Sequence, residues 1–219
     1  MHCFFVWYPA PLAKATGVTE LFLMLLAIDV ILGSLFTLLV YKQGKKSLKF
    51  DLSIIILLQI SAFIFGFYHI AQGRPAWIVL NGDSAELIRA NDILQASADH
   101  AMPEFQHSSW LGPQYVALPS VYGQRKSRSL FEKVSGGLST AQYPHNYIQL
   151  KQASSTIKTK AQEVSSLNSY NEKSKVDKVL SKYLKSSLWM PLQARSLDMV
   201  VLLNDNGEVI KIVDLRPWH

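Results

Sequence analysis

Two long apolar runs dominate the hydrophobic pattern of the chain. Residues 21–40 carry one charge, Asp29, and residues 52–70 carry no Asp, Glu, Lys or Arg. A helix of about 20 apolar residues crosses the hydrocarbon core of a bilayer, whereas a helix on a soluble protein keeps one polar face. The pattern therefore predicts a transmembrane helical hairpin, residues 18–72, with helices at about 18–41 and 51–71.

The segment between the two runs is basic. Short loops rich in lysine stay on the cytoplasmic side of a membrane, so both flanks of the hairpin should face the opposite side. In a Gram-negative bacterium that side is the periplasm, which predicts a multi-pass inner-membrane protein with a periplasmic C-terminal domain. The alternative is a loop that touches anionic lipid and does not fix the topology. The lysines concerned are Lys42, Lys45, Lys46 and Lys49.

Residues 1–17 form a separate N-terminal segment. It contains Trp7 and Tyr8, which are typical of a membrane interface, followed by Pro9 and Pro11. Two interpretations are open: a short interfacial anchor, or the end of a first transmembrane helix whose earlier part is absent from this start. We favour the second.

Polar residues inside the hairpin are candidates for partner binding. An ionisable group near the middle of a bilayer costs about 2.5–3.5 kcal/mol on insertion scales, so Asp29 should face protein or water. It should meet a polar group on a partner helix or, alternatively, bond within the hairpin to Gln59 or Ser61. Small residues allow close helix approach, and Gly33 lies one turn after Asp29. With Arg74, which follows the second helix and could hold a lipid headgroup, the partner-binding candidates are Asp29, Gly33, Gln59 and Arg74.

Residues 73–219 should form a small periplasmic α+β domain. Runs rich in Val, Ile and Leu flank two turn signals, Asn81-Gly82-Asp83 and the Asn-Asp-Asn-Gly sequence at 204–207. Three- and four-residue apolar spacing predicts helices within 146–187, with a break near 168–171. The expected result is an antiparallel sheet packed by helices. The predicted strands are 76–80, 85–88, 197–203 and 208–215.

The charge pattern narrows the partners. The net charge is +6, but the basic residues do not alternate with aromatic ones, so no nucleic-acid partner is predicted. Eight lysines lie between Lys151 and Lys185. They indicate a solvated helix face or, alternatively, a surface that meets anionic headgroups or an acidic partner.

No pattern in the chain predicts catalysis. Nucleophile elbows, phosphate loops and paired carboxylates are absent from the sequence. The histidines His100, His107 and His145 match no ligand spacing. We therefore predict no catalytic residue, no metal site and no cofactor.

Five features of the chain belong together: residues 5–17 (FVWYPAPLAKATG), 29–33 (DVILG), 45–52 (KKSLKFDL), Gln59 and Arg74-Pro75. In this order they resemble one known family, the type IV pilin accessory proteins of the TfpX/TfpZ group. The resemblance covers about the first 95 residues. It implies an inner-membrane accessory protein with a chaperone-like role, which binds type IV pilin for stabilisation or assembly, in contact with membrane lipid and other pilus assembly proteins. Alternatives are a membrane-anchored periplasmic enzyme that modifies pilin or envelope components, and a structural subunit of the assembly machine.

Overall fold

The computed structural model describes residues 6–41, 47–119 and 138–218. The chain forms two compact units. One is Gly17–Gly73, and the other combines Met1–Thr16 with Arg74–His219. The N-terminal segment, which the sequence analysis set apart, thus folds with the C-terminal domain.

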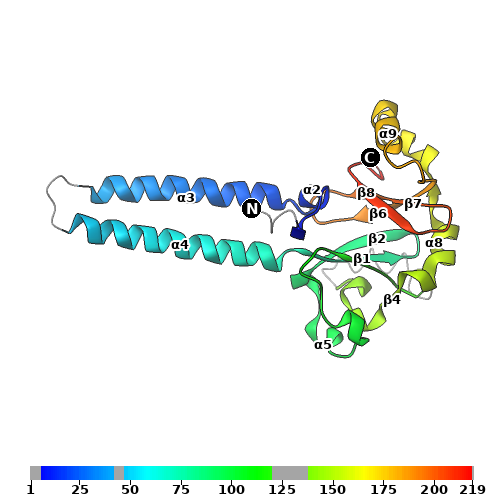
Figure 1. The fold of residues 1–219 in the computed structure, drawn as a ribbon, viewed down its shortest axis with the longest axis horizontal. Coiled ribbons are helices and arrows are strands. Elements are labelled where there is room, and N and C mark those ends of the chain that lie inside the picture. Colours follow the sequence, from blue (N-terminus) through cyan, green and yellow to red (C-terminus); the bar gives the residue numbers. More distant parts are fainter. Residues whose placement is uncertain (1–5, 42–46, 120–137, 219) are drawn as a thin grey trace. The chain divides into compact units, whose positions relative to one another are not determined.

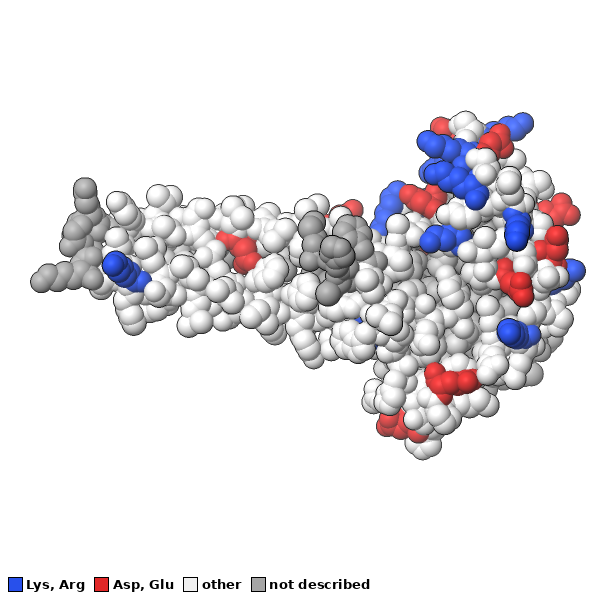
Figure 2. Space-filling model, in the orientation of Figure 1, with Lys and Arg blue, Asp and Glu red and all other residues white. Residues whose placement is uncertain are grey.

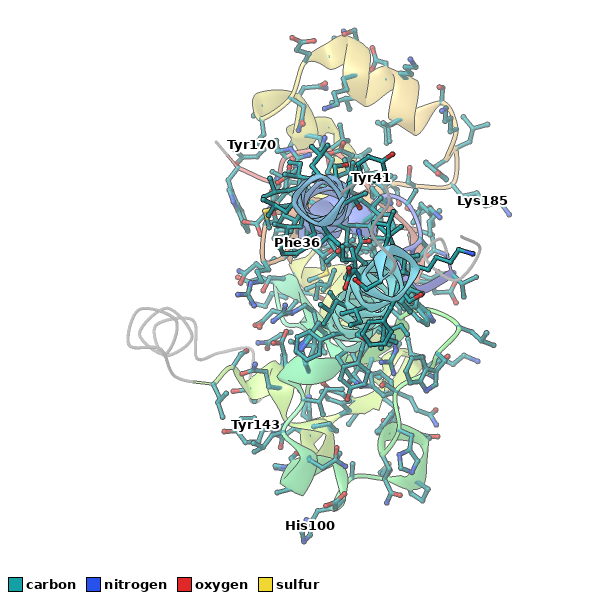
Figure 3. All side chains as sticks on the ribbon, turned by 90° about the vertical axis from the view of Figure 1, so that its left-hand side faces the viewer. Phe36, Tyr41, His100, Tyr143, Tyr170 and Lys185 are labelled. Atoms are coloured by element: carbon teal, nitrogen blue, oxygen red, sulfur yellow. The ribbon has the colours of Figure 1, made fainter. Side chains whose placement is uncertain are left out.

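The first unit is the predicted helical hairpin. Helices α3 (Val18–Val40) and α4 (Leu48–Gln72) run side by side and are long and apolar enough to cross a membrane (Figure 1). Most of their large apolar side chains are exposed, among them Phe36 on the outer surface in Figure 3. Figure 2 shows very few charges along this unit. A core helix of a soluble domain would bury most of this surface.

The second unit is built on a sheet of eight strands in the order β4-β3-β1-β2-β6-β7-β8, with β5 paired to β6. Hairpins β1–β2 and β7–β8 coincide with the two predicted turn signals. The strands are β1 (Pro75–Asn81), β2 (Ser84–Arg89), β3 (Gln114–Ala117), β4 (Ile148–Gln149), β5 (Gln162–Glu163), β6 (Leu188–Gln193), β7 (Met199–Leu203) and β8 (Val209–Val213).

The sheet is mixed, not purely antiparallel as predicted. Strand β1 pairs in parallel with β3, and β2 pairs in parallel with β6. The second pairing joins residues that are distant in sequence, with Ala85 opposite Leu192. Parallel neighbours need a long crossover connection, which local turn signals cannot reveal.

Both faces of the sheet are covered. Along β1, Ile78 and Leu80 point to one face and belong to a core with Ile157 of α8. Trp77 and Val79 point to the other face, as the two-residue period of a strand requires. On that other face, a separate cluster at the β6–β8 side includes Val176 of α9.

Short helices replace the longer ones predicted for residues 146–187. This region is divided among short α- and 3₁₀-helices and the strand β5, because each apolar group packs on a different part of the sheet. The helices of this unit are α2 (Leu12–Thr16), η1 (Ala90–Asp92), α5 (Gln95–Ala98), η2 (Pro103–Phe105), η3 (Thr140–Gln142), η4 (Pro144–Asn146), η5 (Leu150–Ala153), α8 (Ser154–Lys160), η6 (Val164–Ser169) and α9 (Lys173–Leu180).

The N-terminal helix α2 is part of the domain core. Its Leu12 and Ala15 are buried in the cluster that also contains Ile78. The Ala15 carbonyl accepts hydrogen bonds from the backbone N–H of Ser196 (3.0 Å) and of Leu197 (3.2 Å). These contacts link the start of the chain to the segment before β7, a packing that the sequence analysis did not predict.

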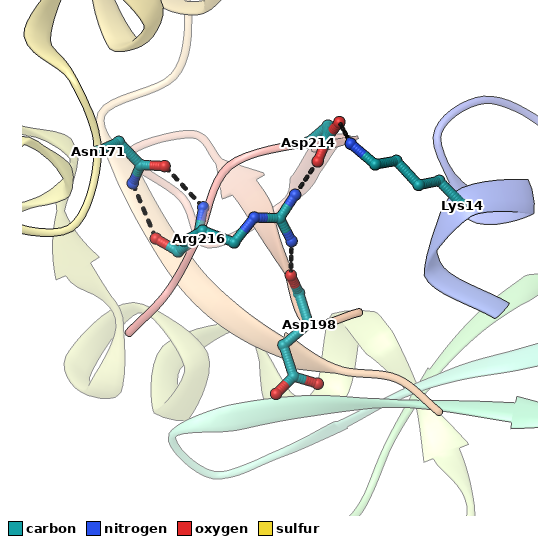
Figure 4. A network of polar contacts seen from close by, with 5 residues as sticks. All are labelled: Lys14, Asn171, Asp198, Asp214 and Arg216. Atoms are coloured by element: carbon teal, nitrogen blue, oxygen red, sulfur yellow. Dashed lines mark hydrogen bonds and ion pairs between the residues drawn. The ribbon is translucent and has the colours of Figure 1, made fainter. Parts of the chain in front are cut away.

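A polar network follows β8 at the end of the sheet (Figure 4). The Arg216 guanidinium donates to the Asp198 carbonyl and to the Asp214 carboxylate, which also pairs with Lys14 of α2 at 2.7 Å. The backbone of Arg216 exchanges two 2.8 Å hydrogen bonds with the Asn171 side chain. The network therefore ties together α2, β8 and the segment before α9.

Candidate functional site

The structure brings three predicted site residues together inside the hairpin. The Gln59 amide Nε2 on α4 donates a 3.0 Å hydrogen bond to the backbone carbonyl oxygen of Asp29 on α3. Gly33 lies beneath the same amide, because a Cβ added at Gly33 would come within 2.0 Å of Gln59 Nε2. The glycine thus leaves the space that the interhelical hydrogen bond occupies.

The Asp29 carboxylate is a different group from the carbonyl that Gln59 binds. Ser61, the other internal partner considered from sequence, donates to the Leu57 carbonyl of its own helix at 2.8 Å. Within the part of the chain that the structure describes, no group donates a hydrogen bond to the Asp29 carboxylate. A half-buried carboxylate in an otherwise apolar span is able to accept a bond from a cation or an N–H or O–H group of another chain.

A second glycine brings the two helices close. A Cβ at Gly66 of α4 would lie 2.7 Å from a Leu25 methyl carbon of α3. Small residues at such positions let helix backbones approach each other in a membrane. Gly33 and Gly66 therefore both fix the packing of α3 on α4, which in turn fixes the face on which Asp29 lies.

Arg74, the fourth candidate, is buried in the C-terminal domain. It donates to Ser108 Oγ at 3.1 Å and to the Ser109 carbonyl at 3.5 Å, and its Cζ lies 3.7 Å from the Trp110 ring centroid. Burial lowers the pKa of the Arg74 guanidinium, and the charge interaction with Tyr8 opposes this shift. Only 5% of the Arg74 surface is exposed, and its guanidinium contacts the loop at residues 108–110.

The four lysines of the predicted cytoplasmic loop are only partly described by the structure. Lys49, in the first turn of α4, is exposed. Lys42, Lys45 and Lys46 lie outside the described residues.

The C-terminal domain contains a polar pocket of about 300 Å³ where β2 and β6 separate. Its carboxylates are already engaged: Glu86 accepts a 2.7 Å hydrogen bond from Ser139, and Asp92 binds Arg89 through two 2.7 Å contacts. The hydrogen bond to Asp92 raises the pKa of Arg89. These paired groups support the local fold.

The histidines occupy separate structural positions. His145 Nδ1 lies 2.7 Å from Ser97 Oγ, and His100 Nδ1 lies 2.8 Å from the Ala96 carbonyl oxygen, at the edge of the domain seen in Figure 3. Over residues 6–41, 47–119 and 138–218, no group of three or more His, Cys, Asp and Glu residues could hold a metal ion.

Exposed lysines gather around α9. Val176 points into the core, while the lysines of this helix and of the following segment face solvent, as the blue atoms at that end of the domain show in Figure 2. This arrangement fits a solvated helix face, and it also provides a cationic surface. The lysines are Lys173, Lys175, Lys178, Lys182 and Lys185.

Comparison with known proteins finds relatives over nearly the whole chain. It is 31% identical over 226 residues to the fimbrial assembly protein of serogroup E1 from Dichelobacter nodosus, and equally to that of serogroup I. Each alignment covers 99% of this chain and 88% of the relative. A fimbrial assembly protein of serogroups C1 and C2 from the same organism is 42% identical over 93 residues, which are 42% of this chain and 71% of that relative.

No protein-family model and no solved structure matches the chain. The similarity to the fimbrial assembly proteins extends through both units, well beyond the motifs that first indicated the family. It confirms the resemblance to the type IV pilin accessory group. This chain belongs to the family of the fimbrial assembly proteins.

Proposed function

We propose that this protein is a membrane-anchored accessory protein that assists type IV pilus assembly by binding the pilin subunit. The names of its relatives support a role in fimbrial assembly. In this proposal the role is chaperone-like and non-catalytic: the protein holds pilin before or during its incorporation. The paired state of the pocket residues Glu86, Arg89 and Asp92 is consistent with a binding role.

The proposed topology places the hairpin in the inner membrane and the C-terminal domain in the periplasm. The lysine-rich connection between the helices supports this orientation, because such loops remain cytoplasmic. An alkaline phosphatase fused after His219 should then be active, since this enzyme works only after export. A cytosolic reporter that is active at the same position would contradict the orientation.

The single observation that carries the proposed contact is the Asp29 carboxylate, which lacks a donor within the described hairpin. A pilin subunit waiting in the membrane would place its apolar helix in the same bilayer. A hydrogen-bond donor or cation on that helix would remove most of the penalty of keeping Asp29 at this depth. Gly33 and Gln59 contribute by fixing the helix pair that presents Asp29, and the periplasmic domain would recognise the pilin head.

The contact is tested by co-purification of pilin with variants of the full chain. Asp29→Leu should retain less pilin, and Asp29→Asn, which keeps an acceptor, should retain an intermediate amount. The control is the double variant Asp29→Leu/Val30→Asp, which restores the charge but turns it about 100° around the helix. It should behave like Asp29→Leu. Unchanged co-purification in Asp29→Leu would remove Asp29 from the contact.

Function in the cell is tested by deletion of the gene. Loss of pili with an unchanged level of pilin transcript is the expected result, and normal piliation would contradict the proposal. Exchange of the pilin allele then separates an accessory protein from a general subunit of the assembly machine. An accessory protein should be needed for one type of pilin, whereas a machine subunit should be needed for every type.

A further inference from the structure

The C-terminal unit exposes a small aromatic and aliphatic surface, which we call the aromatic patch: Val6, Trp7, Trp110 and Leu111. The ring centroids of Trp7 and Trp110 lie 5.7 Å apart, and the angle between the ring planes is 56°. Trp110 is 53% exposed and Leu111 is 85% exposed. The patch joins the N-terminal segment to the 108–111 loop, and Gly112 sits against the Val6 carbonyl, 3.3 Å from where a Cβ would lie.

The patch is held in a fixed orientation. Arg74 lies against the Trp110 ring and donates to Ser108 Oγ and the Ser109 carbonyl. Cation–π contacts of this kind are attractive within about 6 Å. The exposed Trp110 is therefore held in place by a buried arginine.

The groove beside the patch is also mainly apolar. It has a volume of about 380 Å³ and is lined mainly by apolar residues, including Pro9, Pro11 and Ile212. Lys211 is the charged residue among the described residues of this lining. Its positive sign suits the phosphate groups of anionic lipids.

Chain length limits how far the patch lies from the bilayer. Helix α4 has 25 residues, so it is about 37 Å long and exceeds the hydrocarbon core of about 30 Å. Its end therefore reaches the headgroup region. Arg74 follows Gln72 after one residue, so the backbone keeps Arg74 within roughly 7 Å of that end. Trp110 lies one arginine side chain further, whatever the angle between the two units.

We propose that the aromatic patch docks onto the headgroup region of the bilayer that the hairpin spans. Tryptophan favours this region because its ring is apolar and its N–H is polar. Arg74 is a positioning residue in this arrangement, and Leu111 is the side chain that enters the interface. The proposal goes beyond pilin binding and depends only on insertion of the hairpin.

The test uses the full chain with Cys3→Ser, which removes its one cysteine, and a new cysteine at Leu111 that carries an environment-sensitive fluorophore. The protein is reconstituted without pilin in vesicles of phosphatidylethanolamine and phosphatidylglycerol. Met102→Cys is the matched control, because Met102 is 59% exposed and belongs neither to the aromatic patch nor to the lysine-rich surface around α9. Spin-labelled lipid should quench the fluorophore at 111 several-fold more strongly than the one at 102.

Equal quenching at the two positions would overturn the proposal. If the fluorophore at 111 reports an apolar environment only after pilin is added, the patch is a pilin-docking surface and the proposal is overturned. If the environment of the fluorophore at 111 becomes more apolar as the protein-to-lipid ratio rises, the patch mediates self-association and the proposal is overturned. Trp110→Ala should lower the quenching at 111 towards the level at 102, while Trp110→Phe should preserve most of it.

Discussion

The side-chain amide of Gln59 donates a hydrogen bond to the backbone carbonyl of Asp29, and Gly33 leaves the space for it. The bond joins the middle of α3 to the middle of α4. It uses one N–H of the Gln59 amide, and the Asp29 carboxylate has no donor among the described residues. The packing of the two helices and the proposed recognition of pilin thus use different atoms of the same residue.

Substitution at Gly33 should weaken the helix pair through Gln59. In Gly33→Ala the new methyl displaces the amide, so the variant should lose about 0.6–2 kcal/mol of helix association, the range for interhelical hydrogen bonds in membranes. In a Gln59→Leu background the further loss should be smaller, because the bond is already absent. The full chain is labelled on both helices of the hairpin and titrated with SDS. Energy transfer between the labels then measures the loss of helix association in each background. Ser34→Ala, an exposed neighbour, is the control; fully additive losses would contradict the mechanism.

Gly207 should be intolerant of a side chain. Its φ is +77°, and a Cβ there would lie 2.7 Å from the Ser154 carbonyl oxygen of α8. Gly207→Ala should therefore lower the unfolding free energy of the domain by about 1–3 kcal/mol, because it combines backbone strain with a clash against backbone atoms. Thermal unfolding of the full chain in nanodiscs, followed by near-ultraviolet circular dichroism, checks this. Asp205→Ala in the same turn should be near neutral, and an equal effect at both positions would refute the explanation.

The Arg216 network should matter more than the exposed ion pair attached to it. Arg216→Met removes the Arg216 donor of the Asp198 carbonyl and one of the two donors of the Asp214 carboxylate (Figure 4), and it should cost about 1–3 kcal/mol. The Lys14–Asp214 pair involves a lysine side chain that is 60% exposed, so Lys14→Met should cost about 1 kcal/mol or less. The same unfolding assay ranks the two variants. A larger effect for Lys14→Met would show that the network is organised differently.

Stability should fall in strongly alkaline solution because of a buried tyrosine. Burial raises the pKa of Tyr8 from 10.0 to about 12, although the charges of Arg89 and Arg74 act in the opposite direction. The folded state therefore keeps its proton at a pH where the unfolded chain has lost it. This contribution is complete below pH 10 and is lost as the pH rises towards 12, by about 2 kcal/mol.

Tyr8→Phe should reduce this alkaline loss, since phenylalanine does not ionise. Burial also raises the pKa of Tyr147 and of Tyr115, so part of the loss should remain in the variant. Unfolding free energies at neutral pH and at several alkaline values, measured for both proteins, give the comparison. An identical decline above pH 10 would show that Tyr8 does not contribute.

Sequence reasoning identified the elements whose formation depends on neighbours in the chain. The hairpin follows from the length of two apolar runs, and hairpins β1–β2 and β7–β8 follow from turn signals between Val- and Ile-rich segments. Strand β6 was missed because it is short and contains Pro191, which normally disfavours a strand. Strand β3 lies in a region rich in proline and glycine that predicts irregular structure.

The candidate site divides in the same way. Asp29, Gly33 and Gln59 stood out because polar and small residues are rare in a span, but the sequence did not tell which atoms would meet. The sequence did not predict the aromatic patch, because the hairpin and the strands β1 and β2 separate Trp7 from Trp110 along the chain, although their tilted rings meet in the fold. Arg74 was a candidate for holding a lipid headgroup, and the sequence did not predict that it is buried against the 108–111 loop.

By itself, the sequence determined the membrane hairpin, the two strand hairpins and the family. These depend on hydrophobic length, local turn chemistry and the order of motifs, which are properties of contiguous residues. Only the tertiary structure decided the parallel β2–β6 pairing, the packing of α2 in the core and the choice of the Asp29 carbonyl as the acceptor for Gln59. Each of these depends on contacts between distant segments, whose free energy is set by packing in three dimensions and leaves no periodic trace along the chain.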